Sequence, residues 1–191
     1  MKNSILIIIL LTFLNSFGQE SKDFIKSEEY HLTEIDSLTM KKYWENFPTE
    51  NAPEPIPIYL KDKNGQTLYE IKISELEFYS GTSIEVLDID NLKNIEQIIR
   101  LESGYDACCT NYYSTYLIKT KEGELIKLPE IDNLHCDGPE PRFEYRFPNQ
   151  KFGNKRQILM TKSFLNDEYK VDSIERQKSY SWNGKTFESE K

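Results

Sequence analysis

The sequence predicts a mostly β fold, all-β or α+β, arranged as an antiparallel meander, a sandwich or a partly open barrel with one N-terminal amphipathic helix. From residue 56 onward, about ten short runs of strand-forming residues alternate with turn residues, as in antiparallel sheets. Asn64-Gly65 and Asn183-Gly184 separate such runs, and Asn-Gly tolerates the positive φ angles of a tight hairpin turn. Only one stretch, before residue 48, repeats its apolar residues at helical spacing.

Residues 1–18 are predicted to be a secretory signal peptide. Lys2 precedes an apolar run from Ile5 to Leu14, and small residues follow up to Gly18, where we expect cleavage. The run has about ten residues, whereas a membrane-spanning helix needs about 20. We therefore expect a periplasmic or secreted protein with no stable membrane insertion after the signal is removed.

The mature chain is predicted to be one domain. Residues 19–29 are polar and charged and are expected to form a flexible lead-in, and residues 30–191 are long enough for a single hydrophobic core. The net charge of the full sequence is −8, and Lys and Arg do not cluster. Because such a surface repels phosphate backbones, we expect no nucleic-acid partner.

The helix is expected within residues 33–47. Ile35, Leu38 and Phe47 recur at spacings of three or four on one face, together with Tyr43 or Trp44. Thr33, with Asp36 or Ser37, is suited to cap the first turn, and Pro48 ends the helix. The predicted strands follow at residues 56–61, 67–73, 83–89, 96–103, 112–120, 124–129, 143–147, 156–162, 172–182 and 186–188.

Two segments carry a family resemblance. VLDIDNLKNIEQIIRLESG, residues 86–104, resembles the acidic turn and apolar strand of FG-GAP or integrin-type propeller blades, and SYSWNGKTFE, residues 179–188, is similar to the closing strand of such modules in exported bacterial proteins. The resemblance covers about thirty residues and implies β-meander structure. A closed propeller needs at least about four blades, which this chain is too short to supply.

The three cysteines predict one disulfide. Thiols of an exported protein tend to pair, and the favoured bond joins Cys136 to Cys109, with Cys108 as the alternative partner. Adjacent residues of a strand face opposite sides, so only one of the two can face Cys136. A vicinal Cys108–Cys109 bond, a zinc site that adds His135, and a catalytic thiol are the less favoured alternatives.

Calcium is a cofactor that the acidic turn suggests, and we do not expect it. Asp88, Asp90 and Asn91 offer oxygen ligands at nearby positions, but the glycine and the third aspartate of the usual loop are missing. A solvated turn explains these residues better.

The predicted binding surface combines aromatic residues with a Gly/Pro-rich loop. Tyrosines crowd the strand at 112–120, and loops held on a rigid scaffold often carry binding residues. The candidate residues are Tyr112, Tyr113, Tyr116, His135, Asp137 and Arg142.

No catalytic residues are assigned, because the sequence lacks a nucleophile elbow, an H-E-x-x-H motif, a phosphate-binding loop and a dinucleotide fingerprint. The leading hypothesis is an exported, non-enzymatic module that binds a protein or glycan. The alternative is a hydrolase of cell-envelope or extracellular polymers that uses an unrecognised pair of carboxylates.

Overall fold

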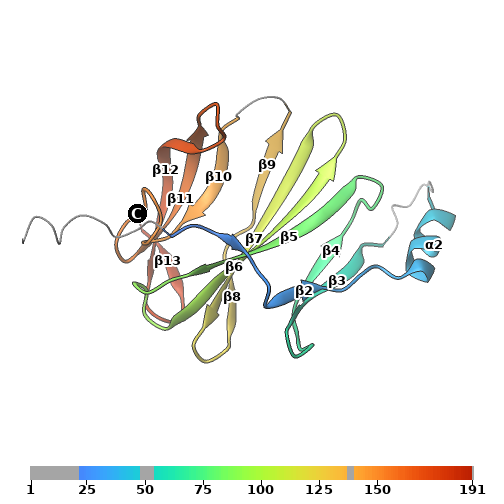
Figure 1. The fold of residues 1–191 in the computed structure, drawn as a ribbon, viewed down its shortest axis with the longest axis horizontal. Coiled ribbons are helices and arrows are strands. Elements are labelled where there is room, and N and C mark those ends of the chain that lie inside the picture. Colours follow the sequence, from blue (N-terminus) through green and yellow to red (C-terminus); the bar gives the residue numbers. More distant parts are fainter. Residues whose placement is uncertain (1–21, 48–53, 137–139, 191) are drawn as a thin grey trace, which may run out of the picture.

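The computed structural model describes residues 22–47, 54–136 and 140–190, and in them it shows three antiparallel sheets and one helix (Figure 1). The mostly β class is therefore confirmed, whereas the predicted signal peptide lies outside the described residues. The elements are β1 (Ile25–Lys26), β2 (Tyr30–Leu32), α2 (Ser37–Glu45), β3 (Ile56–Asp62), β4 (Thr67–Ile73), β5 (Tyr79–Asp88), β6 (Ile95–Asp106), β7 (Thr110–Thr120), β8 (Leu125–Lys127), β9 (Ile131–His135), β10 (Arg142–Arg146), β11 (Gln157–Leu165), β12 (Val171–Trp182) and β13 (Phe187–Ser189).

The central sheet has the order β1-β5-β6-β7-β8, and β9 also pairs with β7. Strand β8 pairs with residues 117–119 of β7, and β9 pairs with residues 110–114 of the same strand. The register places Arg100 beside Glu85 and Tyr116, and places Leu101 beside Thr115. Because side chains alternate along a strand, Arg100 and Leu101 mark the two faces of this sheet.

The two smaller sheets pack on these opposite faces. The sheet β10-β11-β12-β13 forms a core with the Arg100 face, in which Ile98 and Ile118 contact a group that includes Tyr145 and Phe147. The sheet β2-β3-β4 covers part of the Leu101 face. In Figure 1 the two smaller sheets lie towards opposite ends of the long strands β5, β6 and β7.

The helix α2 begins after Asp36, whose side chain accepts hydrogen bonds from the backbone N–H groups of Leu38 and Thr39. Only Tyr43 is buried, whereas Leu38 and Trp44 are 59% and 47% exposed. Of the predicted apolar stripe, Tyr43 and Ile35 pack with residues of β3 and β4, whereas Leu38 and Trp44 remain exposed. The helix lies beyond β3 and β4 at one end of the molecule (Figure 1).

The predicted strands are all present, and the structure adds three that the sequence did not indicate: β1, β2 and β9. Strand β1 lies in the segment that was expected to be a flexible lead-in, and it pairs with β5. Next to it, the ring of Phe24 lies 6.0 Å from that of Tyr116 and 6.2 Å from that of Phe147. Residues 22–29 are thus part of the domain.

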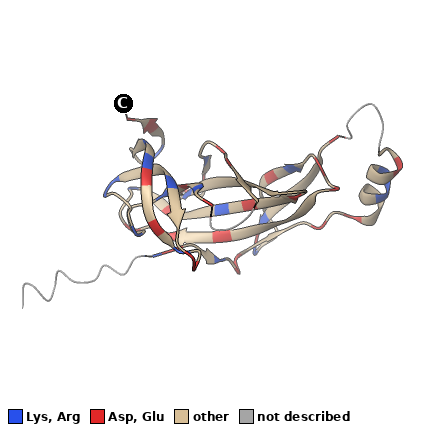
Figure 2. Ribbon diagram, turned by 90° about the horizontal axis from the view of Figure 1, so that it is seen from above, with Lys and Arg blue, Asp and Glu red and all other residues tan. Residues whose placement is uncertain are grey.

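The described surface mixes both signs of charge. Figure 2 shows Lys and Arg interspersed with Asp and Glu along the strands. Within the residues that the structure describes, no helix has the length and apolar character needed to cross a membrane.

Candidate functional site

A disulfide joins Cys109, just before β7, to Cys136, just after β9. It extends the pairing of the two strands, which begins with Thr110 opposite His135. The structure thus has the predicted bond, with Cys109 rather than Cys108 as the partner, and Cys108 is an exposed free thiol. The bond consumes two ligands of the alternative zinc site.

The predicted binding residues do not form one surface. Tyr112 and Tyr113 are neighbours in β7 and therefore lie on opposite faces of the central sheet. Tyr112, His135 and Arg142 line one cavity, and Tyr113 lines another. The expectation for Tyr116 was wrong, because only 1% of this residue is exposed. Asp137 lies outside the described residues.

Tyr116 is buried because the four-stranded sheet covers its face of β7. Its ring lies 5.1 Å from that of Tyr145, in an edge-to-face arrangement. Burial is the main cause that raises the pKa of Tyr116, although the charge of Arg100 acts in the opposite direction. The tyrosine contributes to the core and does not reach solvent.

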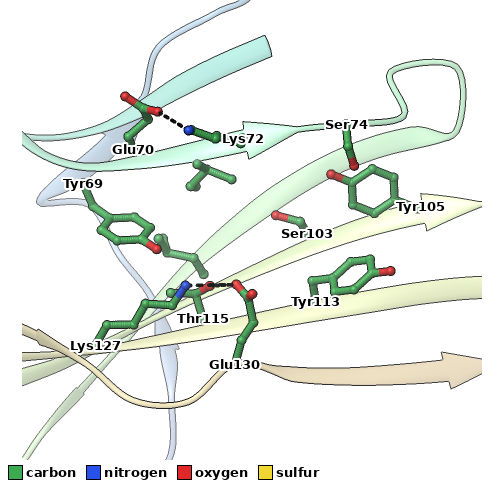
Figure 3. Close-up of a pocket in the computed structure, with 12 residues that line it drawn as sticks. Tyr69, Glu70, Lys72, Ser74, Ser103, Tyr105, Tyr113, Thr115, Lys127 and Glu130 are labelled. Atoms are coloured by element: carbon green, nitrogen blue, oxygen red, sulfur yellow. Dashed lines mark hydrogen bonds and ion pairs between the residues drawn. The ribbon is translucent and has the colours of Figure 1, made fainter. Parts of the chain in front are cut away.

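The cavity that contains Tyr113 is a groove of about 480 Å³, which we call the tyrosine groove. Figure 3 shows it between β4 on one side and β6, β7 and the segment after β8 on the other. Its lining combines aromatic, hydroxyl and charged side chains. The residues are Tyr69, Glu70, Ile71, Lys72, Ser74, Leu101, Ser103, Tyr105, Tyr113, Thr115, Lys127 and Glu130.

The tyrosine groove exists because the three-stranded sheet covers only part of its face of the central sheet. Tyr113, Thr115 and Leu117 alternate along this face of β7. Leu117 is 1% exposed, Thr115 is 7% exposed and Tyr113 is 40% exposed. The cover therefore ends between Leu117 and Tyr113, and the remaining face forms the floor of the groove.

Tyr105 links the groove to the core. Its ring centroid lies 5.6 Å from that of Tyr79 and 5.5 Å from that of Tyr113, which it meets edge to face. Burial raises the pKa of Tyr105 to about 12, and the two neighbouring tyrosines add to the effect. The buried ring of Tyr105 thus supports the exposed ring of Tyr113 from behind.

The charged groups of the groove are paired. Lys127 Nζ lies 3.4 Å from Glu130 Oε1 and 5.6 Å from the centre of the Tyr69 ring. Burial acts to lower the pKa of Lys127, but Tyr69 and Glu130 outweigh it and the pKa is raised. The Thr115 hydroxyl donates to Glu130 at 2.6 Å, which fixes that carboxylate at the groove wall.

The other acidic residue of the groove, Glu70, lies on the wall formed by β4. Its Oε1 is 3.8 Å from the Nζ of Lys72, and this pair is visible in Figure 3. Both acidic side chains are well exposed, at 43% for Glu70 and 50% for Glu130. Each carboxylate thus has a lysine partner and contact with water.

Tyr112, His135 and Arg142 line a smaller cavity of about 190 Å³ on the other face of the central sheet, which we call the loop cavity. Glu140 organises its rim: its carboxylate accepts the backbone N–H of Cys136 at 3.0 Å and lies 3.6 Å from His135 Nδ1. These three predicted residues therefore lie together. Their side chains line a small cavity, however, and do not form a flat aromatic surface.

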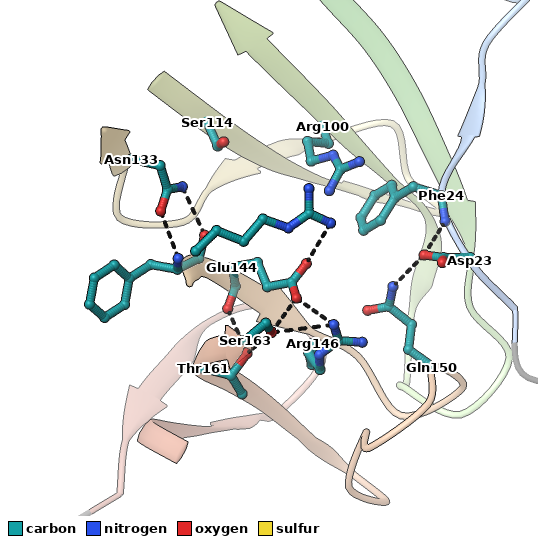
Figure 4. A network of polar contacts seen from close by, with 12 residues as sticks. Asp23, Phe24, Arg100, Ser114, Asn133, Glu144, Arg146, Gln150, Thr161 and Ser163 are labelled. Atoms are coloured by element: carbon teal, nitrogen blue, oxygen red, sulfur yellow. Dashed lines mark hydrogen bonds and ion pairs between the residues drawn. The ribbon is translucent and has the colours of Figure 1, made fainter. Parts of the chain in front are cut away.

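Arg142 is held at this cavity by a buried polar network. Glu144 accepts hydrogen bonds from Arg146 and from the Ser163 hydroxyl, and its second oxygen lies 3.6 Å from Arg142 (Figure 4). The side chains of Glu144 and Arg146 are only 8% and 6% exposed. Such a network stabilises the fold only as a unit, since an isolated buried charge is costly.

The acidic turn that suggested calcium is used for contacts within the protein. Asp90 forms an ion pair with Lys22 at 2.8 Å, and Asp88 accepts a hydrogen bond from Gln97 at 3.1 Å. Asn91 donates to Asn149. Within the described ranges, no group of three or more His, Cys, Asp or Glu side chains is placed to hold a metal ion.

The sequence did not indicate that Tyr69, Lys127 and Glu130 lie near Tyr113. Lys127 and Glu130 lie near it because β8 and β9 pair with β7, whereas Tyr69 comes from β4 in the sheet that packs on this face. The available signal for this site in the sequence was the charged and aromatic residues that lie between the apolar residues of the 67–73 strand. Comparison with family models, curated proteins and solved structures finds no match for this chain.

Proposed function

We propose that the chain is an exported, non-enzymatic module that binds an extended polymer, a protein segment or a glycan, in the tyrosine groove. The observation that carries the proposal is the composition of this groove. Tyr69 and Tyr113 offer ring surfaces, with Tyr105 buried behind Tyr113, while hydroxyl groups and the ion-paired lysines and glutamates offer hydrogen bonds. Binding sites typically combine aromatic surface with a few polar groups of this kind.

The proposal of export is supported by the disulfide. Disulfides persist mainly in oxidising compartments such as the periplasm or the extracellular space. The bond between Cys109 and Cys136 also holds β9 against β7 at the end of the sheet that carries Tyr113. A floor held in place in this way loses little conformational freedom when a ligand binds.

The test compares two tyrosine substitutions. The purified domain is screened against a glycan array and a phage-displayed library of random 12-residue peptides, and the best ligand is titrated by calorimetry. We expect Tyr113→Ala to weaken binding at least tenfold. Tyr169→Ala is the matched control, because Tyr169 is 60% exposed but lines the loop cavity. Equal affinity of the wild type and the Tyr113 variant for every selected ligand would refute the groove as the binding site.

The hydrolase alternative has one observation in its favour, since the carboxylates of Glu70 and Glu130 line the same groove. A glycosidase needs one of its two carboxylates protonated as the general acid. Here each carboxylate is exposed and has a lysine within 4.0 Å. Neither carboxylate lies in a buried, apolar setting of the kind that produces a general acid, so we prefer binding. Release of reducing ends from a bound glycan, abolished in the Glu70→Gln/Glu130→Gln variant, would reverse that preference.

A further inference from the structure

We propose that the ligand of the tyrosine groove is an extended peptide that adds a fourth strand to the free edge of β4. This inference rests on the proposed function, because it uses the same groove, but it specifies the class of ligand and the way it binds. Strand addition of this type obtains its affinity from main-chain hydrogen bonds and its specificity from alternate side chains.

Strand β4 is the edge of the sheet β2-β3-β4. On its far side, none of the strands in the described ranges pairs with it. The direction of its backbone groups follows from Tyr59 in β3. The Tyr59 N–H donates to the Thr33 hydroxyl at 2.9 Å, and its C=O accepts the Thr33 N–H at 3.0 Å. The backbone of Tyr59 therefore points away from β4.

The residue opposite Tyr59 is Glu70, and the residue opposite Pro57 is Lys72. In an antiparallel pair of strands, if the backbone N–H and C=O of one residue point away from the other strand, those of the residue opposite it also point away. The N–H and C=O groups of Glu70 and Lys72 thus point to the free edge of the sheet. They form a short row of donors and acceptors to which another strand can bind.

The tyrosine groove runs along this edge. Four consecutive residues of β4, from Tyr69 to Lys72, line it. Because consecutive side chains of a strand point to opposite faces, a cavity that touches all four follows the edge of the strand and not one of its faces. A neighbouring strand would lie about 4.8 Å from β4, at the position of the groove.

The floor of the groove suits one face of such a peptide. The exposed ring of Tyr113 supplies apolar contact area beside the largely buried Tyr105 and Leu101, and the hydroxyls of Ser103 and Thr115 lie between them. An added strand would direct every second side chain to this floor and the others to solvent. The preferred ligand therefore has apolar or aromatic residues at alternate positions. A sugar chain lacks the regular amide groups that the row on β4 would match.

The test removes one backbone N–H. Lys72→Pro eliminates an outward N–H without removing a hydrogen bond to β3, and proline is tolerated on an edge strand in that orientation. Lys72→Ala is the matched control, because it removes the same side chain and keeps the N–H. The probe is the tightest peptide from the 12-residue library. We expect Lys72→Pro to bind this peptide about tenfold more weakly than Lys72→Ala does, whatever the loss of the lysine side chain costs in both variants.

A second measurement uses the wild-type protein, so that it does not depend on the folding of the proline variant. Each amide of the peptide is methylated in turn, and we expect losses of affinity at every second position only. Affinity that shows no such alternation, or that is equal for the proline and alanine variants, overturns strand addition. If glycans bind in a Tyr113-dependent way and the library yields no peptide, strand addition fails while the proposed groove function stands. If no ligand depends on Tyr113, both fail.

Discussion

Removal of the disulfide should destabilise the domain by about 3.6 kcal/mol. The bond joins residues 27 apart in the sequence. In the chain-entropy treatment, closing a loop of about this size lowers the entropy of the unfolded chain by about 12 cal/mol/K, which gives this value at 25 °C. A change of that size corresponds to about 7–14 °C in Tm for a domain of about 170 residues.

The measurement is urea unfolding, followed by tryptophan fluorescence, of the wild type and the Cys109→Ser/Cys136→Ser variant. Cys108→Ser is the control, because this cysteine is free and exposed. We expect the control to match the wild type within about 0.5 kcal/mol, as is usual for exposed positions. The reasoning would be refuted if the free energy of unfolding of the double variant fell by less than about 1 kcal/mol, or if that of the control fell equally. Either result would show that the bond does not act by restraining the loop of residues 109–136.

Three further predictions concern stability. Glu144→Gln should cost about 3–5 kcal/mol in urea unfolding, because it leaves Arg146 as a buried charge without its anion, and Glu144→Met/Arg146→Met should recover part of the loss. The pKa of Tyr105 is raised to about 12, so its contribution to stability is complete below about pH 10 and is lost between about pH 10 and 12. Over this range, the free energy of unfolding of Tyr105→Phe should fall less than that of the wild type. Gly153→Ala should lower stability by about 1–3 kcal/mol in thermal melts, since the added methyl group would collide with the carbonyl oxygen of Phe147.

The sequence predicted the strands whose signals are local. Runs rich in Ile, Leu, Val and Tyr became β3 to β8 and β10 to β13, and Asn64-Gly65 and Asn183-Gly184 lie in turns. In contrast, β1, β2 and β9 have two to five residues, several of them polar. Such strands form because β5, β3 and β7 offer partners, and this information lies elsewhere in the chain.

The candidate site could be predicted only in part. Alternation along β7 already implies that Tyr112 and Tyr113 face opposite sides. It does not reveal which stretch of each face is covered, because the cover comes from β2 to β4 and from β10 to β13. The free edge of β4 is also invisible in the sequence, since it depends on which strands do not pair with it.

The position of Phe24 constrains the order in which the molecule assembles. This ring belongs to one of the first described residues, yet it contacts Phe147, more than a hundred positions later in the chain. Contacts of high sequence separation slow folding. Completion of the core must therefore wait until β10 has emerged, although β1 can pair with β5 and Phe24 can pack on Tyr116 before then.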